Sequence, residues 1–249
     1  MLTYSMLMIS ADLPDVPPEL PAQLRALLMA IAVRDRGTYS HMRQVAFLVD
    51  RLSDWLGLRE LERCEVTVAA MVHDIGKLGV PEAILLKSGR LSEREMRELA
   101  THAELGASML LRVGTEEEVA RAVLHHHEYF DGGGYPRGLR GSEIPLGSRL
   151  IAVADAYDSM TSPRSYRPGL HSNIAVTEIN RCIGTQFDPD VAGAFIEMLK
   201  AAQADEEQWA IRPGSDPAAT AGPTLALRLG GVRRLRMVAD GAKGEVHTG

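Results

Sequence analysis

Apolar residues in this sequence recur with the 3.6-residue period of an α-helix in one segment after another. The clearest examples are QLRALLMAIAVRD and SHMRQVAFLVDRLSDWL, in which apolar residues stand at positions i, i+3, i+4 and i+7. Between about residues 22 and 200, no segment alternates apolar and polar residues as a half-buried strand would. The sequence therefore predicts an all-α domain built as a helical bundle.

Three pairs of residues predict where further helices begin. Ser92 with Glu95 and Thr115 with Glu118 match the capping box, in which a hydroxyl and a carboxylate cap the first turn. Asp188 before Pro189 matches an N-cap followed by proline at the first helical position, which predicts a last core helix over PDVAGAFIEMLK.

The two ends of the chain differ from this helical part. Residues 1–21 become rich in proline and predict an extended lead-in, whereas residues 22–202 form the predicted domain. Residues 203–249 predict a linker followed by TLALRL and VRRLRMV around a Gly-Gly turn. A short β-hairpin and a tail without regular structure are both open for this segment, because an isolated hairpin is only marginally stable in water.

Composition excludes several classes of partner. The formal net charge of -6 argues against binding to nucleic-acid polymers, and no apolar run is long enough to cross a bilayer. The first residues lack the basic region and cleavage site of a signal peptide. Cys64 and Cys182 stand far apart without CxxC spacing, which favours reduced thiols. We therefore expect a cytoplasmic protein without a membrane partner.

Charged residues enter an apolar stretch at MVHDIGKLG, residues 71–79. His73 and Asp74 stand there in what the pattern predicts to be a buried helix. Burying a charge costs several kcal/mol unless the group is paired or bound to a metal ion, so this pair predicts a functional site. Asp155, in the apolar segment IAVADAYDSM, requires the same explanation.

Histidines and carboxylates recur in several segments that are expected to pack together. Imidazole and carboxylate ligands suit first-row transition metals. A carboxylate that bridges two groups of histidines would hold two ions about 3.5–4 Å apart, an arrangement used for phosphoester hydrolysis. The candidate ligands are His41, His73, Asp74, His102, His126, His127 and Asp155.

The ordered series H41, HDIGK (73–77), H102, HHEYFDGGGYP (126–136) and D155 resembles the HD-GYP family, a branch of the HD-domain metal-dependent phosphohydrolases. The resemblance covers residues 25–200 and implies an HD-domain bundle with a metal site in its core. It implies that the seven candidate residues bind two divalent ions, iron or manganese, with Asp74 as the bridge. The implied activity is hydrolysis of cyclic di-GMP to pGpG, and slowly on to GMP, by a metal-activated water.

The resemblance also implies residues that contact the substrate. Lys77, one turn after His73, would bring its ammonium to the phosphate or the attacking water. In the DGGGYP loop, Gly134 would allow close approach of the backbone to a ligand, and Tyr135 would reach the guanine or the phosphate. Arg164 and Arg167 match positions that hold phosphate, for which the guanidinium fork is suited.

Two neighbours of the histidine run, which consists of His126 and His127, have less defined expected roles. Glu128 is expected to orient a ligand imidazole from behind the metal site. His125 matches no position of the family pattern and is expected at the surface or behind the ligands.

One departure from the family pattern concerns the number of ions. Members with three metals resemble E-x-x-x-H at the first histidine, and here the glutamate position is Gly37. Asp35 is a candidate substitute, but it lies two residues away from that helix face. We therefore expect a two-metal site.

Other functions stay open on the sequence alone. The chain could be an HD hydrolase acting on another nucleotide. It could also be a weakly catalytic cyclic di-GMP receptor or an interaction module that docks to diguanylate cyclases with GGDEF domains. A homodimer is compatible with either function.

Overall fold

A computed structural model of the chain describes residues 16–18, 20–87, 89–163 and 168–210, with side chains as far as residue 203. The predicted all-α class is confirmed, since the described residues form helices joined by turns, with one isolated bridge between Ile183 and Phe187. The elements in chain order are α1 (Ala22–Arg34), α2 (Arg36–Trp55), α3 (Glu60–Val72), the 3₁₀ helix η1 (Ile75–Gly79), α4 (Glu82–Leu85), α5 (Glu93–Ala100), α6 (His102–Arg112), α7 (Glu117–Leu124), the 3₁₀ helix η2 (Gly141–Glu143), α8 (Leu146–Thr161), α9 (Ser172–Arg181) and α10 (Pro189–Ala210).

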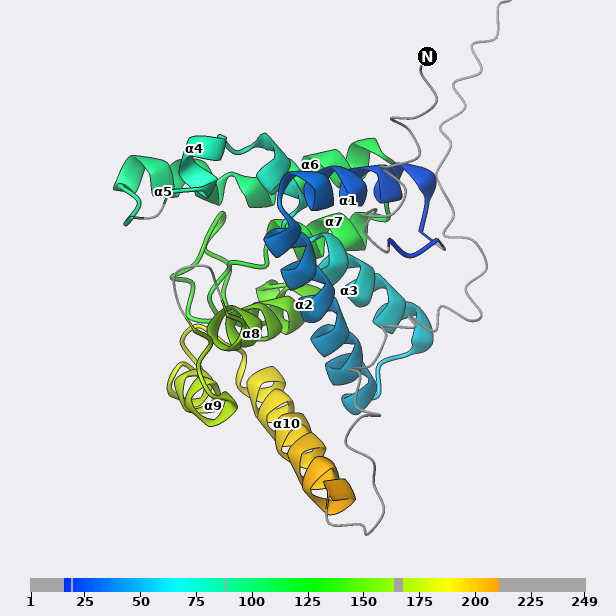
Figure 1. Ribbon diagram of the computed structural model, residues 1–249, viewed down its shortest axis with the longest axis vertical. Coiled ribbons are helices and arrows are strands. Elements are labelled where there is room, and N and C mark those ends of the chain that lie inside the picture. The colour runs from blue at the N-terminus through cyan, green and yellow to red at the C-terminus, as the bar shows by residue number, and fades with distance from the viewer. Residues whose placement is uncertain (1–15, 19, 88, 164–167, 211–249) are drawn as a thin grey trace, which may run out of the picture.

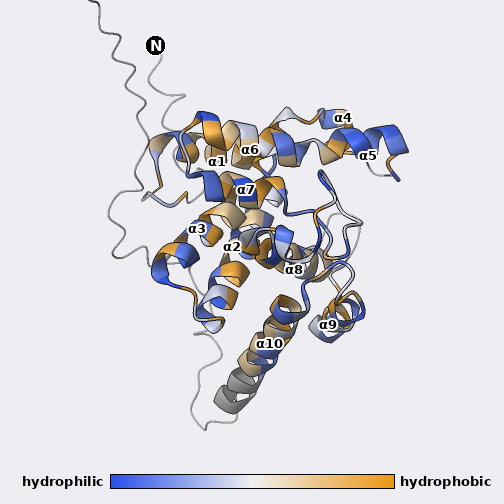
Figure 2. Cartoon of the chain, turned by 180° about the vertical axis from the view of Figure 1, so that it is seen from behind, coloured by the Kyte–Doolittle hydropathy of each residue, from blue (hydrophilic) through white to orange (hydrophobic). Residues whose placement is uncertain are grey.

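Helices α2 and α3 pack along each other in the middle of the bundle, and α8 packs across α2 (Figure 1). Helix α7 lies between α3 and α6, while α9 and α10 close the other end. Helices α4 and α5 project from the side of α6, and α5 is largely hydrophilic and has no buried residue (Figure 2). Among the described residues, no helix is both long and apolar enough to cross a membrane.

One continuous apolar core runs from α1 to α10. Its largest fully buried side chains include Leu28, Met42, Met71, Leu150 and Phe195, which come from five different helices. Burial of each such side chain contributes roughly 1.5–3 kcal/mol relative to exposure. The helices that form the core are therefore also the ones that fix the polar segments between them.

Two of the three predicted helix starts are confirmed. The Ser92 hydroxyl accepts a hydrogen bond from the Glu95 N–H at 3.3 Å, and the Glu95 carboxylate accepts one from the Ser92 N–H at 2.7 Å. Asp188 accepts hydrogen bonds from the N–H groups of Asp190 and Val191 at 2.8 and 3.2 Å. Both carboxylates satisfy donors that the first helical turn leaves unpaired.

The capping box predicted at Thr115 is wrong. Helix α7 begins at Glu117 without a side-chain cap, and the Thr115 hydroxyl is buried without a hydrogen-bond partner. The reason lies in the preceding helix. The Thr115 N–H is bonded to the carbonyl oxygen of Leu110, and Gly114 has a φ of 76°, so these residues still terminate α6.

The stretch around His73 and Asp74 is buried as predicted, but it is not a continuous helix. Helix α3 ends at Val72, and the chain turns at Asp74 into η1. A Cβ atom on Gly76 would lie 1.9 Å from the carbonyl oxygen of His102, so η1 rests directly on the backbone of α6. This close approach brings Asp74 beside the histidine that begins α6.

Residues on either side of the predicted 22–202 domain are also structured. Val16 and Leu20, in the predicted lead-in, already pack against the core. Helix α10 continues beyond residue 202 to Ala210, so the first part of the predicted linker is helical. The predicted β-hairpin lies outside the described residues.

We expect Gly76→Ala to lower the free energy of unfolding by about 3 kcal/mol, the upper range for overpacked sites, because backbone atoms on both elements would have to move. Gly193→Ala is the matched control, since nothing lies within 4 Å of its added Cβ in helix α10. That change should be neutral or stabilising by up to about 1 kcal/mol. Urea unfolding followed by circular dichroism measures both, and equal stabilities for the two variants would contradict the packing assignment.

Candidate metal centre

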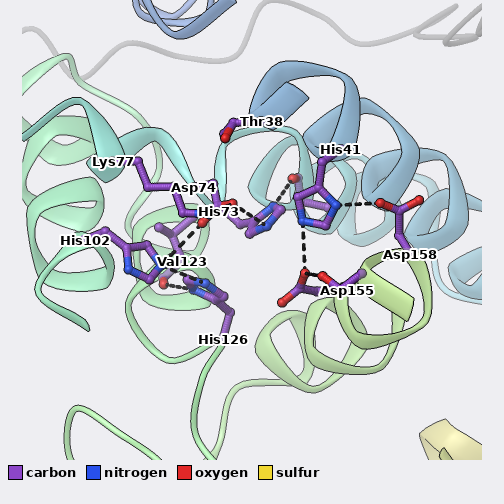
Figure 3. Close-up of polar contacts among 12 residues, drawn as sticks. Thr38, His41, His73, Asp74, Lys77, His102, Val123, His126, Asp155 and Asp158 are labelled. Atoms are coloured by element: carbon purple, nitrogen blue, oxygen red, sulfur yellow. Dashed lines mark hydrogen bonds and ion pairs between the residues drawn. The ribbon is translucent and has the colours of Figure 1, made fainter. Parts of the chain in front are cut away.

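The seven residues predicted as metal ligands converge on one region of the core. Figure 3 labels all of them except His127. Their side chains come from α2, the end of α3, the start of α6, the turn after α7, and α8. They fall into three overlapping groups, and within each group the potential ligand atoms lie within 4.8 Å of one another. The groups are His41, His73 and Asp155; His73, Asp74 and His126; and His102, His126 and His127.

Asp74 stands between the groups. Its Oδ2 lies 3.5 Å from His73 Nε2, and its Oδ1 lies 3.4 Å from His102 Nε2. Each oxygen of the carboxylate therefore faces a different histidine. This is the geometry that a bridging carboxylate requires.

Backbone carbonyls hold three of the imidazoles in one tautomer. The Nδ1 atoms of His73, His102 and His126 lie 2.8, 2.7 and 2.6 Å from the carbonyl oxygen three residues earlier in the chain. Because a carbonyl oxygen only accepts, each Nδ1 carries the proton and each Nε2 has a free lone pair. The acceptor carbonyls lie in the last turns of α3, α5 and α7, where intrahelical partners run out.

Burial keeps the imidazoles of His73, His126 and His127 neutral. It lowers the pKa of His73, lowers that of His126 well below its usual value, and brings that of His127 to about 4. For Asp74, burial favours the protonated acid, but Lys77 and the surrounding imidazoles outweigh it and hold the pKa well below its usual range. The centre thus combines neutral nitrogen donors with an ionised carboxylate, the forms in which these groups bind metals.

His41 is held differently, between two carboxylates of α8. Its Nε2 lies 2.9 Å from Asp155 Oδ1, and its Nδ1 lies 2.5 Å from Asp158 Oδ2. Burial lowers the pKa of His41, but its hydrogen bonds to these carboxylates overcome that effect and raise the pKa to about 9. A metal ion bound at Nε2 would take the place of a proton there.

Asp158 is a residue of the centre that the sequence analysis missed. It is buried and also accepts a hydrogen bond from the Ser162 hydroxyl at 2.8 Å. The available signal was the spacing of Asp155 and Asp158, which places two carboxylates one turn apart on an apolar helix. Since one of them faces each nitrogen of His41, Asp158 orients this histidine.

The donor set fits a transition metal. The Nε2 atom of His73 is buried without a hydrogen-bond partner, which is costly for a polar atom unless something binds it. Every member of the three groups offers an imidazole nitrogen or a carboxylate oxygen, the ligands that suit zinc, iron and manganese. The residues present are therefore compatible with bound divalent ions.

The DGGGYP loop covers one side of this centre. The ring of Tyr135 lies 4.9 Å from the ring of His127, tilted by 34°. A Cβ atom on Gly134 would lie 2.2 Å from the Tyr129 nitrogen and 2.4 Å from the His127 carbonyl oxygen. The glycine at 134 is thus required by packing against the chain's own backbone, whether or not a ligand also approaches it.

The expected role of Glu128 is wrong. Its carboxylate is buried and accepts hydrogen bonds from backbone N–H groups of residues 137–139, not from a proposed ligand imidazole. His125 lies behind the ligands, with its Nδ1 3.4 Å from Glu128 Oε1.

Lys77 contacts the centre through Asp74. Its Nζ lies 2.5 Å from Asp74 Oδ2, and the lysine side chain is 25% exposed. The sequence pattern predicts Lys77 on the same helix as His73. In the structure it reaches Asp74 from η1 instead. Arg164 and Arg167 lie outside the described residues, so their predicted contact with phosphate stays a prediction.

Asp35 is engaged as a helix cap. Its carboxylate accepts hydrogen bonds from the Thr38 N–H at 3.1 Å and from the Thr38 hydroxyl at 2.7 Å. Gly37 lies in the first turn of α2, one turn before His41. Gly37 thus has no side chain that could bind a further metal ion, and the Asp35 carboxylate is already hydrogen-bonded to Thr38.

Comparison with known proteins places this fold and centre in a family. A family model described as an HD domain matches residues 25–191. The chain is 37% identical over 179 residues to a cyclic di-GMP phosphodiesterase of Thermotoga maritima, an alignment that covers 71% of this chain and 49% of the relative. It is 34% identical over 195 residues to the 3'3'-cGAMP-specific phosphodiesterase 3 of Vibrio cholerae, covering 76% of this chain and 42% of the relative.

A solved structure shows the same fold. An HDG"Y"P protein from Bdellovibrio bacteriovorus superposes with a TM-score of 0.55 at 20% identity, covering 72% of this chain and 61% of that chain. The chain belongs to the HD-domain family, in its HD-GYP branch. It spans about half the length of the curated relatives that it matches.

We expect Asp158→Asn to weaken the binding of one metal ion by roughly 10- to 100-fold, because the neutral amide no longer polarises and orients His41. Asp54→Asn is the control, since Asp54 is an exposed carboxylate paired with Arg63 on the surface. Competition with a chelator followed by metal analysis measures the affinity, and the rise of Tm on adding Mn²⁺ provides a second readout. Parent-like affinity in Asp158→Asn would show that His41 needs no such support.

Proposed function

We propose that this chain is a metal-dependent phosphodiesterase that hydrolyses cyclic di-GMP to linear pGpG, with two divalent ions, iron or manganese, as cofactors. The observation that carries the proposal is the position of the ionised Asp74 carboxylate between His73 and His102, each of which lies beside one of its oxygens and belongs to a cluster of potential ligands. A site of this kind can hold two ions that share one carboxylate, the arrangement suited to in-line attack on a phosphodiester.

The family relatives support a cyclic dinucleotide as the substrate class. The relatives from Thermotoga maritima and Vibrio cholerae described above are named for cyclic di-GMP and for 3'3'-cGAMP respectively, at similar identity. Both substrates contain two 3'–5' phosphodiesters between purine nucleosides. The choice of cyclic di-GMP over 3'3'-cGAMP is therefore the part of the proposal that most needs a direct test.

The chain's own residues would bind and orient the substrate around the metal centre. Bound ions would supply Lewis-acid polarisation of a phosphate oxygen and a water of lowered pKa. The partly exposed ammonium of Lys77 would neutralise charge that develops on the phosphate. Burial, together with the nearby carboxylates of Asp74 and Asp155, raises the pKa of Tyr135, so its hydroxyl stays protonated and can donate a hydrogen bond to the substrate.

The direct test is hydrolysis by the protein purified with Mn²⁺ or, without oxygen, Fe²⁺. Cyclic di-GMP and 3'3'-cGAMP are supplied separately and the products are separated by chromatography. We expect pGpG to form from cyclic di-GMP at the higher kcat/KM. Preferred cleavage of 3'3'-cGAMP would correct the substrate, and binding of either dinucleotide without cleavage would favour the receptor alternative.

Asp74→Ala should abolish hydrolysis and lower the metal content, because it removes the carboxylate whose two oxygens face His73 and His102. The helical fold should persist, as judged by circular dichroism, since the surrounding core is apolar. Glu118→Gln, on the exposed surface of α7, is a control for loss of one carboxylate. Turnover in Asp74→Ala with a full complement of metal would refute the bridging role.

The number of ions should determine the product. A third ion would help to neutralise the terminal phosphomonoester of pGpG. Gly37 has no ligand atom, and the Asp35 carboxylate is engaged by Thr38. We therefore expect close to two ions per chain and accumulation of pGpG.

Gly37→Glu should raise the metal content toward three and speed conversion of pGpG to GMP, since position 37 is helical and one turn before His41. Gly37→Gln is the matched control, because an amide of the same length is a poorer metal ligand. Metal analysis and a product time course are run on the same samples. Rapid formation of GMP by the parent protein would show that another group already supplies the third site.

Contacts with other proteins belong to the proposal as expectations. Docking to diguanylate cyclases and homodimer formation are implied by the family resemblance and stay predictions. The same holds for the contact of Arg164 and Arg167 with the substrate phosphate.

A further inference from the structure

The carboxylate of Glu128 is the least expected buried charge near the metal centre, because it forms no hydrogen bond with any of the seven proposed ligands. Its side chain has no exposed surface. Its Oε1 accepts a hydrogen bond from the Arg137 N–H at 2.7 Å, and its Oε2 accepts hydrogen bonds from the N–H groups of Gly138 and Leu139 at 2.9 and 3.2 Å. Three consecutive backbone donors converge on one anion, which is a strong and geometrically specific arrangement.

These donors follow directly after Pro136, the last residue of the DGGGYP loop. The Tyr135 N–H donates a hydrogen bond to the carbonyl oxygen of His127 at 3.2 Å, and Gly134 packs on the backbone of residues 127–129. The loop therefore folds back over the backbone of residues 127–129, and Glu128 lies between the two parts of the chain that meet there. This brings the Tyr135 ring against the ring of His127.

A second set of contacts holds only the beginning of the loop. The N–H groups of Phe130 and Asp131 donate hydrogen bonds to the carbonyl oxygens of Gln186 and Thr185 at 3.2 and 2.9 Å. For residues 137–139, the hydrogen bonds and ion pairs that tie this part of the described chain down are those to Glu128 and an exposed ion pair of Arg137 with Glu104. Beyond them, the Gly141 N–H donates a hydrogen bond to the carbonyl oxygen of Phe130 at 2.9 Å. Residues 137–139 thus depend mainly on Glu128.

We infer that Glu128 is a positioning residue for substrate binding, which acts by holding residues 135–139 so that Tyr135 stands at the metal centre. The inference rests on the proposed function, in which Tyr135 contacts the cyclic dinucleotide. The partners of the Glu128 carboxylate are the loop N–H groups and His125, none of which is a proposed metal ligand, so its effect should appear in binding of the substrate and not in binding of the metal.

The test variant is Glu128→Gln, which preserves volume. In either orientation, the amide places an NH₂ group against backbone N–H donors, so the loop loses at least one of its acceptors. We expect KM for cyclic di-GMP to rise by roughly 10-fold or more, with kcat changed less and metal content unchanged. Glu104→Gln is the matched control, because it removes a carboxylate beside the same loop without touching these N–H groups.

A double-mutant cycle with Tyr135→Ala separates positioning from general destabilisation. If Glu128 acts through Tyr135, Glu128→Gln should raise KM in the parent background but have little further effect in the Tyr135→Ala background. Equal effects in the two backgrounds would overturn the inference, since a loss of stability alone would act in both. The Tm of every variant is recorded to confirm that the kinetics are measured on folded protein.

Hydrogen exchange provides a readout that needs no activity. The amides of residues 137–139 should exchange at least tenfold faster in Glu128→Gln than in the parent or in Glu104→Gln. Unchanged exchange would overturn the positioning role even if the enzyme is active. Conversely, faster exchange in a protein that cleaves neither dinucleotide would locate the failure in the proposed function and not in the role of Glu128.

Discussion

The ionised carboxylate of Asp74, buried among imidazoles, is the group on which the rest of the centre depends. A lone carboxylate in such a place would take up a proton, because burial disfavours its charge. Here the Lys77 ammonium at 2.5 Å and the neighbouring histidines keep it ionised. The surrounding helices must therefore bring one cation and several nitrogen donors to the same point. The ends of α3, α6 and α7 meet there for this reason.

Helix ends place the imidazoles of the centre. His73, His102 and His126 stand at or just beyond helix ends, and the Nδ1–H of each donates a hydrogen bond to a carbonyl oxygen in the last turn of the preceding helix. One local interaction thus satisfies the helix terminus and also directs a lone pair into the centre. The close contact of Gly76 with the backbone of α6 then sets how far apart two of these helix ends lie.

Two further carboxylates support the centre from outside it, in different ways. Asp158 contacts the far nitrogen of His41 and so acts on the metal side. Glu128 contacts backbone N–H groups of the loop that carries Tyr135. In our proposal, metal binding and substrate binding are therefore supported by separate buried charges, although the proposed ligand His127 and Tyr135 are in ring contact.

The sequence by itself determined the helical class, the set of seven candidate ligands and the cap at Ser92, because these follow from periodicity, residue chemistry and local spacing. It did not determine the break of α3 before His73, the missing cap at Thr115 or the roles of Asp158 and Glu128. Those depend on which backbone atoms and side chains from distant segments meet. Only the tertiary structure decides such contacts, since packing of η1 on α6 and of the loop on the histidine run overrides local propensity.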